Sequence, residues 1–191
     1  HTMSFNLVLF GGTGDLAWRK LMPALFQSFR HGTLPEGAFI VGVARDEMSD
    51  AKYREYIKAR FVEVEGAKRP TDEEFEKFAA LLHYQRVDLS KPETFKALAH
   101  RLKERSVDVN VMYLATAPSL FATTCEQLAD NGLTGDNTRV VLEKPLGHDL
   151  ASNCASNTAV REVLQEWQIF RIDHYLGKPS VQNLFALRFG N

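Results

Sequence analysis

The chain has 191 residues, of which 45% are hydrophobic and 25% charged, a composition typical of a folded globular domain. Lys and Arg total 23 against 24 Asp and Glu, so the formal net charge of -1 argues against binding of nucleic acid by bulk electrostatics. The two cysteines, Cys125 and Cys154, lack neighbours at metal-ligand spacing and indicate a reducing compartment without disulfides or a metal site. No apolar run reaches the roughly 20 residues that span a bilayer and no signal peptide opens the chain, so we expect a cytoplasmic protein that does not enter a membrane.

Short apolar runs alternate with longer segments of helical period along the chain. The apolar runs predict six strands, at residues 7–10, 39–43, 84–87, 109–115, 139–142 and 168–172. The intervening segments predict helices over 16–29, 49–62, 119–129 and 149–166, and two more that open with capping boxes at Thr71 and Ser90. Apolar strands separated by helices are typical of a parallel sheet buried on both faces, and therefore of a doubly wound, Rossmann-like α/β fold.

The first strand runs directly into the glycine-rich turn Gly11-Gly12-Thr13-Gly14-Asp15, which opens the first helix. Glycines allow a sharp turn and a close approach to a pyrophosphate, whose charge the backbone N–H groups at the helix N-terminus would meet. The G-G-x-G spacing is shorter than the common G-x-G-x-x-G, so an ordinary tight turn is the alternative. Asp15 suits the helix N-cap better than a ligand-binding role.

The residue that follows the second strand selects the type of dinucleotide. An acidic residue there binds the ribose 2′-hydroxyl of NAD, whereas an arginine accommodates the 2′-phosphate of NADP. This chain has Arg45 at that point, and Thr13 could add a hydroxyl donor. We therefore predict NADP, with NAD as a second cofactor, although Asp46 would weaken the preference and a solvated Arg45 is the alternative.

Two polar clusters follow later strands, at the edge where open parallel sheets bind ligands. Residues 143–147 read Glu-Lys-Pro-Leu-Gly, and Lys144 would point an ammonium into the crevice; the alternative is a surface lysine in a turn. Residues 171–178 read Arg-Ile-Asp-His-Tyr-Leu-Gly-Lys, a density of polar groups that predicts a site.

The second cluster has the chemistry to hold a phosphate monoester. His174, Tyr175 and Lys178 can each donate a hydrogen bond to a phosphate oxygen, and two of them can carry charge. Asp173 would repel a phosphate, so we assign it another task, such as the orientation of a histidine.

These motifs are similar to those of the glucose-6-phosphate dehydrogenase family. Residues 11–21 resemble its nucleotide turn, 143–147 and 171–178 its other two signatures, and 183–189 its next segment. The resemblance implies oxidation of the C1 hydroxyl of β-D-glucose 6-phosphate to the 6-phosphogluconolactone, the first step of the pentose phosphate pathway, with hydride passing to NADP. It further implies a homo-oligomeric full-length enzyme and an NADP-binding domain over residues 3–175. Residues 176–191 would then begin a larger α+β domain that this chain lacks.

The resemblance also implies a role for each matched residue. Lys20 and Lys144 face the cofactor and the sugar, Pro145 is a cis proline, and Asp173 pairs with a catalytic histidine in the missing domain. Catalytic roles fall to Asp173 and Lys144, and substrate contacts to Lys20, Lys144, His174, Tyr175 and Lys178. The cofactor contacts are Gly11, Gly12, Thr13, Gly14, Asp15, Leu16, Arg45 and Lys144.

Three features depart from the family pattern. Trp18 stands where Lys or Arg is usual and Pro179 where Glu is common, and residues 115–118 read Ala-Thr-Ala-Pro where an Ala-Pro-Pro-like segment is usual. Two other functions remain open from the residues alone: a different NAD(P)-dependent sugar dehydrogenase, and a non-catalytic module that senses a nucleotide. The phosphate-binding cluster at 173–178 argues against the first, and turnover by the intact protein would exclude the second. Since the expected base lies in the missing domain, we expect the chain alone to be inactive.

Overall fold

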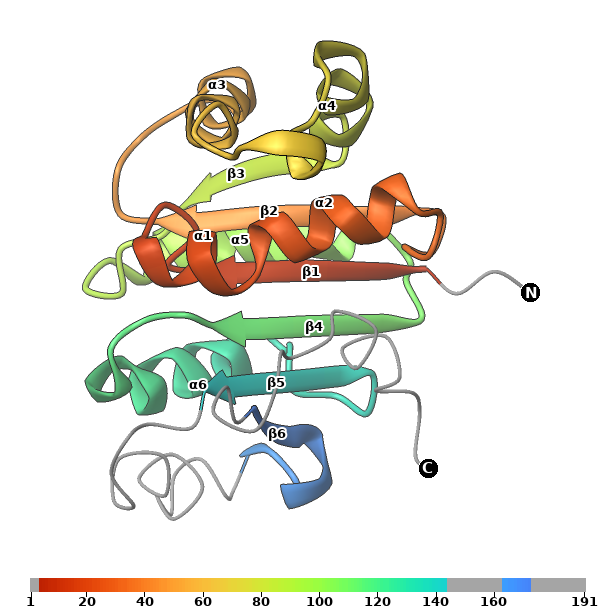
Figure 1. Ribbon diagram of the computed structural model, residues 1–191. Coiled ribbons are helices and arrows are strands. Elements are labelled where there is room, and N and C mark those ends of the chain that lie inside the picture. Colours follow the sequence, from red (N-terminus) through yellow and green to blue (C-terminus); the bar gives the residue numbers. More distant parts are fainter. Residues whose placement is uncertain (1–3, 144–162, 173–191) are drawn as a thin grey trace.

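A computed structural model describes residues 4–143 and 163–172, and these form a six-stranded sheet with helices on both faces (Figure 1). Every paired strand is parallel to its neighbour, and the spatial order is β3-β2-β1-β4-β5-β6. The strands are β1 (Phe5–Phe10), β2 (Ala38–Ala44), β3 (Leu82–Arg86), β4 (Val109–Leu114), β5 (Thr138–Glu143) and β6 (Ile169–Ile172). The predicted doubly wound α/β fold is confirmed, with all six strands within a few residues of their expected positions.

Helices of the described chain divide between the two faces of the sheet. The first group is α1 (Asp15–Lys20), α2 (Met22–Arg30), α3 (Asp50–Phe61) and α4 (Asp72–Ala79), and the second is α5 (Pro92–Lys103) and α6 (Phe121–Asp130). Short 3-10 turns occur at η1 (Gly66–Lys68), η2 (Pro118–Leu120) and η3 (Glu166–Gln168). None of the helices in these ranges is long and apolar enough to cross a membrane.

Two apolar cores result from the alternation of side chains along each strand. In β1, Leu7 and Leu9 join the core under α1 to α4, whereas Val8 and Phe10 join the core under α5 and α6. Successive side chains of a strand point to opposite faces, so a strand that is apolar at nearly every position can supply both cores. This explains why β1 and β4 are buried along their whole length.

The helix expected over 16–29 is instead two helices that meet at Leu21, whose φ of -131° departs from helical geometry. Pro23 is the second residue of α2. Because proline lacks an N–H and its ring clashes with the carbonyl four residues earlier, a continuous helix through this position is disfavoured. The expectation of one helix was wrong for this reason.

Of the two predicted capping boxes, one is confirmed and one is wrong. Thr71 Oγ1 accepts from the Glu74 amide at 3.1 Å, and Glu74 Oε1 accepts from the Thr71 amide at 2.9 Å. Ser90 instead donates from both its amide and its hydroxyl to Asp88 Oδ1, and Lys91 becomes the N-cap of α5. The Asp88 carboxylate is a charged acceptor two residues away and outcompetes the helix for the serine.

Two helix boundaries also differ from expectation. Ser119 lies in η2, and α6 begins at Phe121. Of the helix expected over 149–166, residues 149–162 lie outside the described part. Glu166 does not continue it, because Gln165 caps η3.

A tyrosine crosses β2 to reach the turn after β1. Tyr53 of α3 is fully buried, and its hydroxyl donates to the Gly12 carbonyl at 2.9 Å. The ring lies over Gly42 of β2, where an added Cβ would come within 2.3 Å of the Tyr53 Cζ and hydroxyl oxygen. Burial raises the pKa of Tyr53, so the hydroxyl remains a donor throughout the physiological range. Gly42 therefore makes room for the ring that holds the turn.

Replacement of Gly42 by alanine should destabilise the protein by about 1–3 kcal/mol, the usual range for an overpacked core. The Tyr53 ring cannot yield without breaking its hydrogen bond to Gly12. Urea unfolding monitored by circular dichroism measures the change. Gly135→Ala is the matched control, because its new Cβ would meet nothing closer than Asn137 Oδ1 at 3.7 Å. Equal stability of the two variants would contradict the steric argument.

Candidate functional site

The strand order places a topological switch point between β1 and β4. From β1 the chain proceeds to β2 and β3 on one side, and then returns to β4 on the other (Figure 1). Ligands of open α/β sheets bind outside the carboxyl ends of the strands at such a point. The glycine turn follows β1 there, and Ala115 and Thr116 follow β4.

The glycine turn is fitted tightly between the ends of β2 and β4. The amides of Gly11 and Gly12 donate to the Val43 carbonyl at 2.8 and 3.0 Å, and Gly11 has a φ of +84°. A Cβ on Gly11 would lie 2.5 Å from the Ala115 carbonyl oxygen. Both glycines are thus required by packing, and their amides are directed at β2 instead of at a ligand. The predicted pyrophosphate contacts must come from the residues that follow.

Those following residues lie nearer the surface. Thr13 is half-buried and its carbonyl accepts from the Tyr56 hydroxyl at 2.6 Å, whereas Gly14 and Asp15 are exposed. The first-turn amides of α1 have no acceptor within their own helix, a property that makes helix starts suited to anions. The helix has only six residues, so local amide donors would matter more there than a long helix dipole.

Asp15 was expected to cap the first helix, and this was wrong. Gly14 is the N-cap and Asp15 is the first helical residue, where its carboxylate accepts from Arg60 Nη2 at 2.8 Å. The hydrogen bond and charge of Arg60 hold the pKa of Asp15 below its usual value. Gly14 can take the N-cap position because it has extended backbone geometry and needs no side chain to do so.

Arg60 also explains Trp18, whose role the sequence did not suggest. The guanidinium lies 5.3 Å from the centre of the Trp18 ring, and the ring packs edge-on against Phe61 at 4.8 Å. Trp18 therefore joins α1 to α3. Leu16 packs against the same core, and Lys20, one turn further along α1, is half-buried.

Arg45 is exposed and follows β2 directly, one strand away from Thr13. Its carbonyl accepts from Arg86 Nε at 3.0 Å. The carbonyl of the next residue, Asp46, accepts from the Tyr84 hydroxyl. Burial, with the nearby charges of Asp46 and Glu47, raises the pKa of Tyr84 to about 12. The backbone after β2 is thus held to β3 while the Arg45 side chain stands at the ligand edge.

Thr116 is a candidate that pattern reasoning missed. Its hydroxyl oxygen is buried, and no residue of the described ranges offers it a hydrogen bond. Its Cγ2 lies 3.3 Å from the place that a Cβ on Gly11 would occupy, so it stands beside the glycine turn. A buried hydroxyl without a partner costs roughly 1–3 kcal/mol. A polar ligand at the switch point would supply that partner, which fits a nucleotide.

The two later clusters begin at neighbouring strand ends. In the parallel register Glu143 of β5 pairs with Ile172 of β6, the last residue of each strand. Glu143 accepts from the hydroxyl of buried Tyr113 at 3.0 Å, and burial together with this carboxylate raises the pKa of Tyr113. The candidate residues beyond these ends lie outside the described part of the chain: Lys144, Pro145, Asp173, His174, Tyr175, Lys178 and Pro179.

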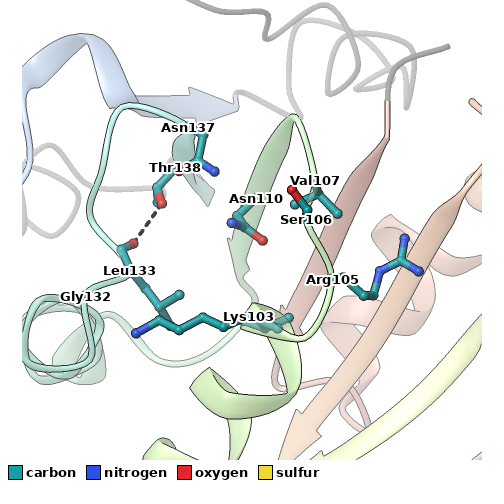
Figure 2. Close-up of a pocket in the computed structure, with 10 residues that line it drawn as sticks. Lys103, Arg105, Ser106, Val107, Asn110, Gly132, Leu133, Asn137 and Thr138 are labelled. Carbon is teal, nitrogen blue, oxygen red and sulfur yellow. Dashed lines mark hydrogen bonds between the residues drawn. The ribbon is translucent and has the colours of Figure 1, made fainter.

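A polar cavity of about 230 Å³ lies at the opposite, amino edge of the sheet (Figure 2). Its cations already have partners: Lys103 donates to the Asn131 carbonyl at 2.5 Å, and Arg105 donates to Asn6 Oδ1 and the Gly37 carbonyl. Lys103 ends α5 and Asn131 follows α6, so a positive charge there offsets the negative ends of two helices. These cations therefore have a structural explanation, and the carboxyl edge remains the candidate site.

Comparison with known proteins identifies the family of this chain. Residues 8–183 match the family described as "Glucose-6-phosphate dehydrogenase, NAD binding domain". The glucose-6-phosphate 1-dehydrogenases of Mycolicibacterium smegmatis and Rhizobium meliloti are 44% and 42% identical to this chain over 97% and 98% of its length. This chain spans only 38% of the length of each.

Two solved structures have the same fold over nearly the whole chain. A glucose-6-phosphate dehydrogenase in complex with its substrate glucose-6-phosphate superposes with a TM-score of 0.77 at 33% identity, covering all of this chain and 40% of that one. The glucose-6-phosphate 1-dehydrogenase of Mycobacterium avium has a TM-score of 0.75 at 36% identity, with 98% and 40% covered. The chain with its glycine turn at the β1–β4 switch point belongs to the glucose-6-phosphate dehydrogenase family and represents that family's NAD-binding domain.

Proposed function

We propose that this chain provides the NADP site and part of the sugar site of an enzyme that oxidises glucose 6-phosphate at C1 to the 6-phosphogluconolactone. The observation that carries the proposal is the glycine turn at the switch point with Arg45 one strand away. The curated relatives, named glucose-6-phosphate 1-dehydrogenase, support the choice of substrate. Within this proposal residues 3–175 form the nucleotide domain and 176–191 begin the next one.

The described residues would hold the cofactor in two places. The amides of Thr13, Asp15 and Leu16 would donate to the pyrophosphate, because the Gly14 amide already donates to the Gly11 carbonyl at 3.0 Å, and Thr116 would offer its hydroxyl on the β4 side. Arg45 would bind the 2′-phosphate, because a guanidinium can donate two parallel hydrogen bonds to phosphate oxygens. Bound NADP supplies the hydride acceptor.

The substrate side rests on residues outside the described ranges. His174, Tyr175 and Lys178 would bind the sugar phosphate, and Lys144 and Lys20 would lie between sugar and cofactor. Asp173 would orient the histidine that takes the proton from the C1 hydroxyl and would stabilise its charged form. The register that pairs the ends of β5 and β6 supports a shared site for Lys144 and this cluster.

Replacement of Arg45 by alanine should weaken NADP binding about tenfold or more and leave NAD binding nearly unchanged. The lost charge-assisted phosphate contact is worth roughly 1.5–3 kcal/mol, and NAD has no phosphate at that position. Titration calorimetry of the 191-residue chain with each cofactor measures both constants. Lys77→Ala removes an exposed cation from α4 as a control. Equal losses for the two cofactors would remove Arg45 from the 2′-phosphate.

The 191-residue chain alone should form no NADPH from glucose 6-phosphate, although it should bind NADP. We place the general base beyond this chain, and such a base supplies about 10²–10⁴-fold of the rate by itself. Absorbance of NADPH at saturating substrate and cofactor is the measurement. Substrate-dependent turnover by the pure chain would overturn the placement of the base.

Substitutions of Asp173 and of His174 should have different kinetic effects in a protein of the full length of the relatives. His174→Asn should mainly raise KM, because a bound phosphate changes little between ground and transition state. Asp173→Asn should mainly lower kcat, by about 10²-fold or more, because it stabilises a charge that develops as the proton moves. Steady-state kinetics of both variants decides between the roles. The opposite pattern would show that the two assignments are reversed.

A further inference from the structure

A second arginine stands beside Arg45 at the ligand edge. Arg86 is the last residue of β3, and the parallel register pairs it with Ala44, the last residue of β2. Its Nε donates to the Arg45 carbonyl at 3.0 Å. The neighbouring carboxyl ends of β2 and β3 (Figure 1) therefore bring the Arg86 guanidinium to the backbone of Arg45, 41 positions away in the sequence.

Only part of the Arg86 guanidinium is used in this contact. An arginine has five N–H donors, and the bond to Arg45 takes the one on Nε. Within the described ranges, no hydrogen bond or ion pair occupies its two Nη groups, and the side chain is only half-buried. Four donors thus remain for a ligand at this edge.

The acidic residues near these arginines indicate that a bound phosphate would need both guanidinium groups. Asp46 and Glu47 directly follow Arg45, and Asp88 lies two residues after Arg86. Asp88 accepts from the amide and the hydroxyl of Ser90, which occupies one of its oxygens. A single guanidinium among three carboxylates would leave the surroundings of a phosphate negative, and a second one reduces that excess.

We propose that Arg86 is a second determinant of NADP specificity, which binds the 2′-phosphate through Nη and holds the Arg45 backbone through Nε. The inference rests on the proposed function and adds a residue to it. Two guanidinium groups can surround a phosphate with fork-shaped pairs of donors, an arrangement that a lysine cannot reproduce. The same arrangement offsets the repulsion expected from Asp46.

The alternative is that Arg86 only supports the backbone of Arg45. Binding of NADP and of NAD is compared to distinguish this role from a phosphate contact. Loss of the Arg45 carbonyl contact would loosen the backbone after β2, which both NADP and NAD would approach with the same adenosine ribose. Loss of a phosphate contact would affect NADP alone. Displacement of Arg45 would also weaken NADP alone, so the selectivity of Arg86→Gln is measured again in an Arg45→Ala background: a direct phosphate contact of Arg86 still weakens NADP there, whereas an effect that acts through Arg45 disappears and overturns the assignment.

Titration calorimetry of Arg86→Gln and Arg86→Lys with NADP and with NAD tests the proposal. We expect Arg86→Gln to weaken NADP about tenfold or more, with NAD changed less than about twofold, and Arg86→Lys to fall between. Arg54→Gln is the matched control, because Arg54 Nε donates to the Leu82 carbonyl at 2.9 Å at the other end of β3. It should change neither constant. Thermal unfolding of each variant checks that the fold is intact.

Each other outcome has a definite meaning. Equal weakening of NADP and NAD in Arg86→Gln, or no weakening of either, overturns the assignment of Arg86. If Arg45→Ala weakens NADP selectively at the same time, the proposed function stands and only the second arginine fails. If the unmodified chain binds neither cofactor, the proposed function and the inference both fail.

Discussion

The Val43 carbonyl accepts hydrogen bonds from the amides of both Gly11 and Gly12, and this pair of bonds fixes the turn on which the site depends. The turn is bound to β2 on one side, and on the other side Gly11 lies against the carbonyl of Ala115, which directly follows β4, so only glycine fits there. Tyr53 adds a hydroxyl donor from α3 to the Gly12 carbonyl. The end of β2, the glycine turn and α3 thus support one another. Such a preorganised turn lowers the entropic cost of binding a ligand there.

The glycines of this turn differ from the simplest interpretation of a nucleotide-binding motif. The amides of Gly11 and Gly12 donate to the Val43 carbonyl of β2. Because these glycines lack a side chain, the turn can lie in close contact with the neighbouring strand ends. Donors for a phosphate must therefore come from the exposed residues after them and from Arg45. This division separates a buried half of the motif, which builds the fold, from a more exposed half, to which we assign the ligand.

The two edges of the sheet use positive charge for different purposes. At the amino edge Lys103 and Arg105 donate to backbone carbonyls and to a buried asparagine, so their charges stabilise helix ends and loops. At the carboxyl edge Arg45 is exposed, and among the described residues four of the five N–H donors of Arg86 have no hydrogen-bond partner. A cavity lined by cations therefore does not by itself indicate a ligand site. What matters is whether those cations already have hydrogen-bond partners within the protein.

The sequence by itself determined the fold class and indicated a candidate site, because both predictions depend on local patterns. Alternating apolar strands and helical periods predict the parallel sheet, the turn after β1 is visible as three glycines in four residues, and Thr71 and Glu74 form their capping box as predicted. The tertiary structure decided which contacts hold these pieces. The Ser90 hydroxyl donates to Asp88 instead of capping α5. Gly14, and not Asp15, is the N-cap of α1, and the Asp15 carboxylate accepts from Arg60. Tyr53 and Tyr56 reach the turn across 41 and 43 positions, and Arg86 reaches Arg45 across 41. Contacts at such separations leave no local periodicity or spacing, so only the folded chain shows them.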